Sequence, residues 1–449
     1  MKKLLSLLLA LMMILSLAAC GETKPEELPD YKTELTKQEL NYSLDELEDY
    51  AAMETHIYDN DLPALYKYFE GLVDIGVAFT SNQIAAFGAE GLDLNQPSND
   101  SNINIMKSIL KHYNIYVLGN EMKPDHMNPA PGVYNFDNGD KFVEFGKAAG
   151  AKLRGHTLLW HSQVPQWWFK ADPNDSSSLA DCQAKGTLAT SEQLVERIET
   201  YITDVMTHFK DDVKIWDVCN EVLNANGIRR IGDDNSYWAD IVGDLDGNGY
   251  ADDYVEIAFN AARKAGGEDQ ILMINDFNME WQNSKTNALY DMVERMLLKG
   301  VRIDGVGFQS HIGIDCNVAL YRQNIEKIAS LSEIYDECFP EYKGNFRVQI
   351  TELDMNMFAN AEPGFRHWTD EEFEKQAQKY AELFDMFLDF VDEGKIDAIL
   401  FWGTDDENSW LNSLNGKMCT NAALLAKRDN YVIKPCYWSI ARTAFNHKK

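Results

Sequence analysis

The chain has 449 residues, of which 45% are hydrophobic and 25% are charged, so it has ample apolar content for a large globular core. It carries 41 Lys and Arg against 72 Asp and Glu, a formal net charge of −31. Such an acidic surface repels phosphate backbones and anionic lipid headgroups. This argues against nucleic-acid binding and leaves a neutral substrate or a cationic partner open.

The first twenty residues have the pattern of an export signal. Met1 to Lys3 is a basic start, and Leu4 to Leu17 is an apolar run too short to span a bilayer comfortably. The run ends in Leu17-Ala18-Ala19-Cys20, which resembles the bacterial lipobox, where a peptidase cleaves before the cysteine and the cysteine is diacylated. We expect residues 1–19 to be a signal peptide and Cys20 to anchor the exported protein to the membrane at the bacterial cell surface. An ordinary secretory signal with an incidental cysteine is the alternative.

Residues 20–61 are predicted to be the lipidated cysteine, a spacer and a lead-in, because residues 21–45 are polar, acidic and without apolar periodicity. The six cysteines after Cys20 include no CxxC or Cys/His pair with zinc spacing. Export permits disulfides among them, but the sequence does not give their pairing.

From Leu62 onward, short apolar runs alternate with amphipathic segments. Eight runs are apolar on both faces, as parallel strands are: Asp74–Phe79, Ile115–Asn120, Lys152–His161, Val213–Glu221, Ile271–Phe277, Gly305–His311, Arg347–Leu353 and Asp397–Trp402. Helices are predicted between them at Glu192–Phe209, Tyr254–Lys264, Lys285–Leu298, Ala319–Cys338 and Glu371–Glu393.

Eight strand–helix units without a linker-like break predict an α/β fold, a single (β/α)8 TIM barrel over residues 62–446. A doubly wound open sheet is the alternative. No GxGxxG or GxxxxGK[ST] motif follows a predicted strand, so no nucleotide site supports that alternative.

Two carboxylates stand out at one end of the predicted barrel. The carboxyl ends of barrel strands share one mouth, and polar clusters end at least six of these strands. Glu221 ends the fourth strand and Glu352 lies on the seventh, so the two can flank a bound ligand. A pair of carboxylates in this arrangement can cleave a glycosidic bond. The rival interpretation is a metal site formed by His156, His311 and Glu352.

Five motifs in order carry a resemblance to a known family: NEMK (120–123), RGHTLLWHSQVPQWW (154–168), WDVCNE (216–221), GVGFQSHI (305–312) with ITELD (350–354), and FWGTDDENSW (401–410). The chain resembles the family 10 glycoside hydrolases, which are retaining endo-β-1,4-xylanases, over about residues 62–446. The resemblance implies endo-hydrolysis of xylan and xylo-oligosaccharides, with no cofactor required.

The resemblance also implies roles for particular residues. Glu221 would be the acid/base and Glu352 the nucleophile. His311 would hydrogen-bond Glu352, with Asp354 orienting it from behind, and Asp217 would support the site in the same way.

Substrate-binding roles are implied for nine residues in all. Asn220 would contact the 2-hydroxyl of the sugar being cleaved, and His311 would also face the substrate. Hydroxyls on the glycon side would be bound by Asn120, Lys123, His156 and Gln309, and the cleft walls would be formed by Trp160, Trp402 and Trp410. A related β-glucanase or other β-glycanase is the alternative enzyme. A catalytically silent carbohydrate-binding lipoprotein is the alternative from another class, although binding alone needs neither glutamate.

The chain departs from the family pattern at several places. Gly119 stands where the family often has a Glu that helps to grip the second glycon-side sugar, and Phe277 stands where it usually has Tyr. Residues 171–190, which include Cys182, lengthen the loop after the third strand.

An acidic insertion follows the fourth strand. Residues 244–252 read D-x-D-G-N-G-x-x-D, which is typical of a calcium loop, with possible ligands Asp244, Asp246, Asn248 and Asp252. The twelfth position of an EF-hand would need Glu and is Val255 here. A plain acidic turn is an equal alternative, and any calcium would be structural.

Overall fold

A computed structural model describes residues 51, 55–59, 62–89, 92, 94, 98–232, 236–357, 368–413 and 431–448. The predicted signal peptide, Cys20, the spacer and Cys419 lie outside these residues. Within the described ranges, no helix combines the length and the apolar character that a membrane span requires.

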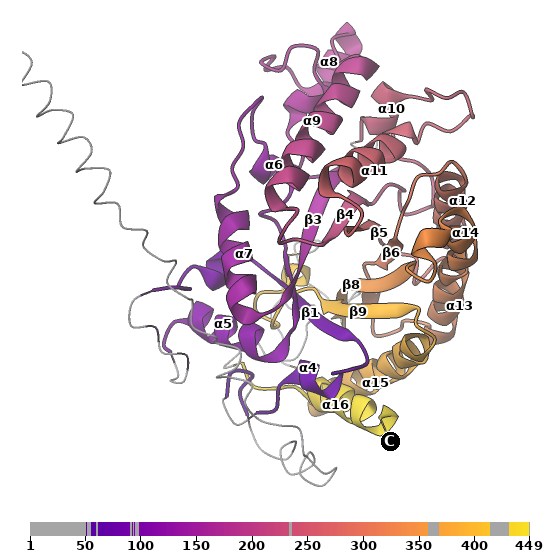
Figure 1. The fold of residues 1–449 in the computed structure, drawn as a ribbon. Coiled ribbons are helices and arrows are strands. Elements are labelled where there is room, and N and C mark those ends of the chain that lie inside the picture. The colour runs from indigo at the N-terminus through magenta and orange to yellow at the C-terminus, as the bar shows by residue number, and fades with distance from the viewer. Residues whose placement is uncertain are drawn as a thin grey trace, which may run out of the picture. The chain divides into compact units, whose positions relative to one another are not determined.

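Eight parallel strands close into a barrel (Figure 1). They are β1 (Asp74–Phe79), β2 (Ile115–Leu118), β3 (Lys152–Trp160), β4 (Ile215–Asn220), β5 (Ile271–Asp276), β6 (Gly305–Phe308), β8 (Arg347–Asn356) and β9 (Ile396–Phe401). The pairing of β1 with β9 and of β6 with β8 completes the ring. The predicted (β/α)8 barrel is confirmed, and the open doubly wound sheet is wrong because it would leave two unpaired edge strands.

The strands are apolar on both faces because helices cover their outer face and packed side chains fill the barrel interior. Every residue of β2 and β4 is buried, and β1 is buried from Ile75 onward. Packing on the outer face of the barrel is tight, where the ring of Trp216 lies 6.3 Å from that of Phe209 between ring centres. A Cβ atom on Gly155 of β3 would lie 2.2 Å from Cε3 of Trp216 on β4, so the position requires glycine.

Helices surround the strands (Figure 1). They are α4 (Leu65–Tyr68), α5 (Ser101–His112), α6 (Pro124–Met127), α7 (Asp137–Ala149), α8 (Leu179–Lys185), α9 (Ser191–Phe209), α10 (Trp238–Val242), α11 (Asp253–Gly266), α12 (Asn283–Leu298), α13 (Val318–Ala329), α14 (Leu331–Cys338), α15 (Asp370–Asp392) and α16 (Pro435–His447). Capping boxes at Thr190 and Thr369 begin the two longest, α9 and α15.

The prediction of one continuous helix over residues 319–338 is wrong. The chain divides at Ser330 into α13 and α14, and α14 packs against α12. The Ser330 hydroxyl donates to the carbonyl of Lys327 at 2.7 Å, and such a bond back to the preceding turn bends a helix.

The two ends of the described domain meet. His56 forms an antiparallel bridge with Val432, and Ile57, which is fully buried, donates from its N–H to the carbonyl of Tyr431 at 3.0 Å. Helices α4 and α16 are in contact beside them (Figure 1). Residues 55–59, predicted as part of the lead-in, therefore pack onto the domain predicted to begin at residue 62.

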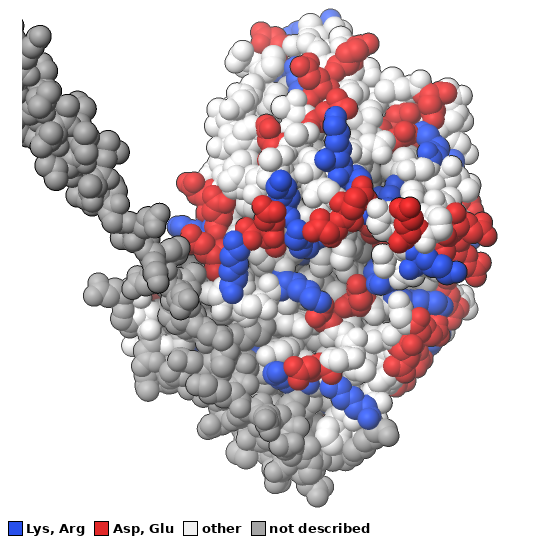
Figure 2. Space-filling model, viewed as in Figure 1, with Lys and Arg blue, Asp and Glu red and all other residues white. Residues whose placement is uncertain are grey.

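Acidic and basic side chains are interspersed on the face shown in Figure 2. Several of the acidic groups are paired, as in the ion pairs of Lys152 with Asp74 at 2.6 Å and of Lys147 with Asp212 at 2.7 Å. These pairs are solvent-exposed on the lysine side and contribute little to stability.

Candidate active site

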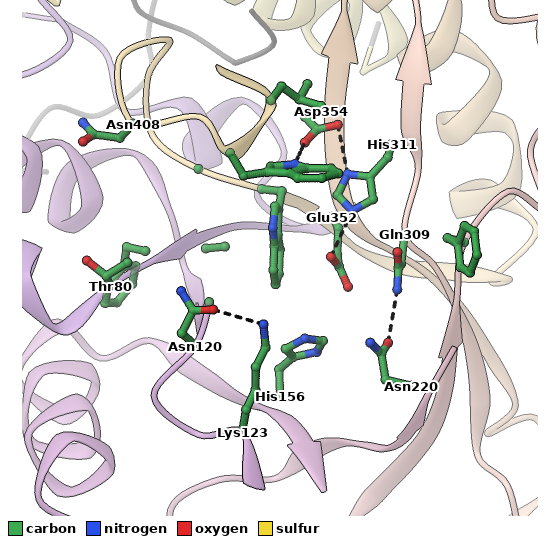
Figure 3. Close-up of a pocket in the computed structure, with 18 of the residues that line it drawn as sticks. Thr80, Asn120, Lys123, His156, Asn220, Gln309, His311, Glu352, Asp354 and Asn408 are labelled. Atoms are coloured by element: carbon green, nitrogen blue, oxygen red, sulfur yellow. Dashed lines mark hydrogen bonds and ion pairs between the residues drawn. The ribbon is translucent and has the colours of Figure 1, made fainter. Parts of the chain in front are cut away.

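A cavity of about 1130 Å³ opens at the carboxyl ends of the strands. Its lining comes from all eight barrel strands or the loops that follow them, and Figure 3 shows part of it. Its lining includes these predicted site residues: Asn120, Lys123, His156, Trp160, Asn220, Glu221, Gln309, His311, Glu352, Asp354, Trp402 and Trp410.

Glu352 lies within β8 and is held by two side chains. Its Oε1 accepts a hydrogen bond from Nδ2 of Asn275 at 2.7 Å, and its Oε2 lies 3.1 Å from Nε2 of His311. The other ring nitrogen of His311 lies 3.0 Å from Oδ1 of Asp354 (Figure 3). His311 comes from β7 (His311–Gly313), a short strand that pairs with the end of β8 and places His311 opposite Asp354.

These contacts favour the ionised form of Glu352. Burial acts to raise its pKa, but the hydrogen bond from His311 and the charges of His156 and His311 outweigh burial, and the pKa of Glu352 is lowered. Burial acts to lower the pKa of His311, but the negative charge of Asp354 and the bonds to both carboxylates raise it well above its usual value. The arrangement is an ionised carboxylate beside a protonated imidazole.

Glu221 follows β4 directly, and its environment favours the opposite protonation state. Burial raises the pKa of Glu221, and the charges of Asp276 and Glu352 raise it further against the hydrogen bond from Gln309. That bond runs from Nε2 of Gln309 to Oε1 of Glu221 at 3.2 Å. A carboxyl group with a raised pKa and one with a lowered pKa in the same cavity are suited to proton donation and nucleophilic attack respectively.

Asn275, at the end of β5, links the two carboxylate-bearing strands. Its Nδ2 donates to Glu352 and also to Oδ1 of Asn220 at 2.9 Å, and its Oδ1 accepts from the Thr351 hydroxyl at 2.7 Å. A Cβ atom on Gly307 of β6 would lie 2.3 Å from this Oδ1, so the glycine makes room for the amide.

Lys123 and Asn120 lie on the other side of the cavity (Figure 3). The Lys123 ammonium donates to Oδ1 of Asn120 at 3.2 Å and to Oε1 of Gln163 at 2.7 Å, and it lies 4.6 Å from the centre of the Trp160 ring. Burial lowers the pKa of Lys123 to about 8, although the charges of Glu352 and Glu221 oppose this shift. The Lys123 ammonium is therefore a hydrogen-bond donor that is already partly desolvated before a substrate binds.

A buried network supports His156 from beneath the cavity. Its Nδ1 lies 2.9 Å from Oδ2 of Asp217, which leaves Nε2 to face the cavity. Nε of Arg154 donates to the same oxygen at 3.0 Å, and both Arg154 and Asp217 are 1% exposed. Burial acts to raise the pKa of Asp217, but the charge of Arg154 and the bond to His156 lower it. Asp217 therefore lies behind the lining, where it orients His156.

Two indoles close the cavity at the loop after β9. Trp402 packs its ring against His156 at 5.3 Å and His311 at 6.3 Å between ring centres. Nε1 of Trp410 donates to Oδ2 of Asp354 at 2.7 Å, and the side chain remains 39% exposed. Flat rings fixed beside hydrogen-bonding groups are suited to stacking on sugar rings.

Three residues have roles in the site that the sequence did not predict: Gln163 lines the cavity, and Asn275 and Arg230 contact residues that line it. Asn275 lies in the polar cluster near the end of the predicted strand Ile271–Phe277, and Gln163 lies inside one of the five motifs, so both carried a signal. Arg230 carried none, because it lies nine positions after Glu221 and returns to it only through a turn, with Nη2 3.6 Å from Oε2 of Glu221.

The geometry does not gather the rival metal ligands. His156 faces Asp217, whereas His311 bridges Glu352 and Asp354. Across the described ranges, only Asp244, Asp246 and Asp253 place three His, Cys, Asp or Glu ligand atoms within 4.8 Å of one another.

The acidic insertion therefore gathers a different set from the predicted one. Asp252 forms an ion pair with Arg295 at 2.6 Å, and Asp253 takes its place in the cluster. The backbone N–H of Asn248 donates hydrogen bonds to Oδ1 of Asp244 and Oδ1 of Asp246, both at 3.0 Å. Nζ of Lys299 lies 2.7 Å from Oδ2 of Asp246. The cluster lies outside the cavity, and the calcium loop stays a prediction. The five cysteines that the structure describes are all free thiols.

Comparison with known proteins gives one consistent family. The model of glycosyl hydrolase family 10 matches residues 80–443. An endo-1,4-beta-xylanase C from Paenibacillus barcinonensis is 39% identical over 74% of this chain, and an exoglucanase XynX from Acetivibrio thermocellus is 36% identical over 85% of it. This chain spans only 28% and 30% of the length of those two relatives.

A solved structure shows the same fold. It is a variant of the intracellular xylanase TsXylA from Thermoanaerobacterium saccharolyticum in complex with xylotetraose. Its sequence is 35% identical, with a TM-score of 0.67, and the match covers 85% of this chain and 99% of that chain.

Proposed function

The chain belongs to glycosyl hydrolase family 10, and from this premise we propose that it hydrolyses internal β-1,4-xylosidic linkages of xylan with retention of configuration. One observation carries the proposal. Glu221, with a raised pKa, and Glu352, with a lowered pKa, line one cavity together with indole rings and amide side chains.

In the proposed mechanism, the ionised Glu352 attacks the anomeric carbon while Glu221 gives its proton to the departing glycosidic oxygen. The glycosyl–Glu352 ester is then cleaved by a water molecule, whose proton returns to Glu221. His311 and Asn275 hold the two oxygens of Glu352 in place. Oδ1 of Asn220 accepts hydrogen bonds from Asn275 and Gln309, which directs its Nδ2 toward a sugar hydroxyl. The steps need no cofactor.

The substrate is proposed to be xylan and its oligosaccharides. The named activity of the Paenibacillus relative and the xylotetraose in the TsXylA complex support this choice. The exoglucanase name of the second relative supports a β-glucanase as the alternative. Product profiles on xylan, cellulose and mixed-linkage glucan discriminate the two, and no hydrolysis of any of them would favour a silent carbohydrate-binding protein.

The mechanism is tested by Glu352→Ala and by the stereochemistry of the first product. We expect the variant to lose hydrolysis while it still binds xylo-oligosaccharides, because the cavity walls are unchanged. Glu144→Ala, on the exposed face of α7, is the matched control. NMR of the wild-type reaction should show the β-anomer first. If the α-anomer appears first, the double-displacement mechanism is wrong.

We also propose that the protein is exported and anchored to the membrane through Cys20. The support is the sequence alone, a basic start and an apolar run that ends in Leu17-Ala18-Ala19-Cys20. A lipid anchor is compatible with a polymeric substrate outside the cell.

A further inference from the structure

The loop after β4 folds back on the residue that ends the strand. Leu223 and Arg229 form an antiparallel bridge, and the carbonyl of Ile228 accepts from the N–H of Asn224 at 2.8 Å. The turn is further fixed by Oδ1 of Asn224, which accepts from the N–H of Ile228 at 3.1 Å. This hairpin returns the chain so that Arg230 lies beside Glu221.

A buried ion pair anchors the hairpin to the barrel. Asp276 and Lys285 lie 2.7 Å apart, and both side chains are fully buried. Oδ2 of Asp276 accepts from the N–H of Leu223 at 3.3 Å, and Lys285 donates to the carbonyl of Leu223 at 3.2 Å. The position of Arg230 is therefore set by the barrel and not by a loosely held loop.

Arg230 contacts both the backbone and the carboxyl group of Glu221. Its Nε donates to the carbonyl of Glu221 at 2.8 Å, and its Nη2 lies 3.6 Å from Oε2. Glu221 has φ of +54°, the left-handed region that costs a non-glycine residue free energy. The N–H of Glu221 donates to the carbonyl of Asn275 at 2.8 Å, so Asn275 and Arg230 hold this conformation from its two sides.

We propose that Arg230 is the positioning residue of the acid/base: it holds the left-handed backbone of Glu221 and stabilises the carboxylate that remains after Glu221 has given up its proton. This inference rests on the proposed function. The 3.6 Å between Nη2 of Arg230 and Oε2 of Glu221 is longer than a hydrogen bond but within ion-pair range. Ionisation of Glu221 converts the contact into a charge-assisted pair, which the second step of the reaction reverses.

The other charged and titratable groups around Glu221 do not supply this positive charge at such short range. Asp276 and Glu352 are negative, and Lys123 acts from the opposite side of the cavity. Nδ1 of His161 lies 3.7 Å from Oε2, but burial and the charge of Arg230 lower the pKa of His161 to about 3, so this ring is neutral. Within the described part of the chain, Arg230 is the only lysine or arginine that pairs with Glu221 within 4.0 Å.

The test compares Arg230→Met with Arg229→Met, which removes the same charge from the exposed neighbouring position. Two substrates are used: polymeric xylan, whose leaving group needs a proton, and 2,4-dinitrophenyl β-xylobioside, whose leaving group does not. For Arg230→Met we expect kcat/KM on xylan to fall about 10- to 100-fold, within the range of general acid catalysis. On the aryl substrate we expect kcat/KM to change less than about twofold, because glycosylation there needs no acid.

The pH profile supplies a readout that a purely structural role would not move. Glu221 must be protonated at the start of the reaction, so the alkaline limb of kcat/KM on xylan reports its pKa. Loss of the adjacent positive charge should move this limb to higher pH by about one unit. Arg230→Lys keeps the charge and should leave the limb near that of the wild type, while Arg229→Met should leave both the limb and the rates unchanged.

Two outcomes would overturn the inference. In the first, Arg230→Met leaves the alkaline limb unmoved and lowers kcat/KM equally on both substrates, which would show only a general structural defect. The other is an equal shift in Arg229→Met, which would show a non-specific charge effect. Melting temperature and the rate at which a 2-fluoro aryl xylobioside labels Glu352 verify that the variants are folded. If the wild type hydrolyses neither substrate, the proposed function fails, a result distinct from failure of the role of Arg230.

Discussion

Nδ2 of Asn275 donates a 2.7 Å hydrogen bond to Oε1 of Glu352, across 77 positions of sequence. The amide is fixed because its own oxygen accepts from Thr351 and because Gly307 leaves space for it. A neutral donor at this point stabilises the carboxylate form of Glu352, whereas an additional negative charge would oppose it. The relationship therefore links a residue on β5 to the protonation state of the proposed nucleophile.

Asn275→Asp should move the acid limb of kcat/KM on xylan to higher pH. Glu352 must be ionised to attack, so activity is lost as pH falls through its pKa, and a carboxylate in place of the amide raises that pKa by about one unit or more. Asn275→Ala removes the hydrogen bond without adding a charge. It should lower kcat/KM by an amount equivalent to about 1.5–3 kcal/mol with a smaller shift of the limb. A full pH profile is measured for both variants. If their acid limbs of kcat/KM lie at the same pH, this account is contradicted.

Glu280→Gln should stabilise the protein at pH 8 more than at pH 5. Glu280 is fully buried, and neither carboxyl oxygen accepts a hydrogen bond of ordinary geometry from the described residues. Burial raises the pKa of this carboxyl to about 7. The native state therefore binds the proton more tightly than the unfolded state. The associated stability is present in full below pH 4.5 and is lost as pH rises through 7, a change of about 3 kcal/mol.

Urea unfolding of wild type and Glu280→Gln at the two pH values measures this difference. The exposed α7 residue Glu144 provides the control substitution Glu144→Gln, which should change the free energy of unfolding equally at both pH values. If Glu280→Gln gives the same change at pH 5 and pH 8, Glu280 does not titrate with a raised pKa.

The barrel could be predicted from the sequence because its strands are buried on both faces, which gives runs such as Ile115–Leu118 a continuous apolar pattern. The break at Ser330 could not, because the apolar spacing of α13 continues into α14 and the bend depends on one hydroxyl bond. Cavity residues at strand ends, such as Asn220 and Gln309, follow from the position of those ends. The contact of Arg230 with Glu221 depends on a hairpin held by the Asp276–Lys285 ion pair, and no local pattern shows it.

Cys20→Ala should leave the protein unprocessed by the lipoprotein peptidase and unacylated. The cysteine follows Leu17-Ala18-Ala19 at the end of an apolar run, and acylation requires its thiol. Cells that express wild type or variant are labelled with a fatty-acid analogue, and the label on the protein is compared. Equal labelling of the two would contradict lipidation at Cys20 and favour an ordinary secretory signal.

Chelation should leave the steady-state kinetics of xylan hydrolysis unchanged, because the two-carboxylate mechanism uses no metal and the acidic cluster does not line the cavity. If residues 244–253 bind calcium, the ion must displace the Lys299 ammonium from Asp246. The melting temperature should then rise with added calcium in the wild type and not in Asp253→Asn. A fall in turnover that follows metal loss, with the fold intact, would favour the rival metal interpretation.

Gly119 stands where the family resemblance implies a Glu that grips the second glycon-side sugar. A Cβ atom at this position would have only the carbonyl of Phe79 within 4 Å, at 3.7 Å, so a side chain fits without backbone strain. The nearby Glu121 does not replace the missing carboxylate, because its oxygens accept from the N–H groups of Ser81 at 2.6 Å and Asn120 at 3.4 Å. One charge-assisted hydrogen bond to the substrate should therefore be absent, a loss of about 1.5–3 kcal/mol.

Gly119→Glu should raise kcat/KM for xylotriose more than for polymeric xylan, because the polymer can use distant subsites and the short oligosaccharide cannot. Gly119→Gln is the matched control: it has the same length without the charge and should give a smaller gain, since a neutral acceptor forms a weaker bond. Steady-state kinetics on both substrates decide the question for variants whose melting temperatures equal that of the wild type. An unchanged or lower efficiency on xylotriose would show that this hypothesis about the subsite is wrong.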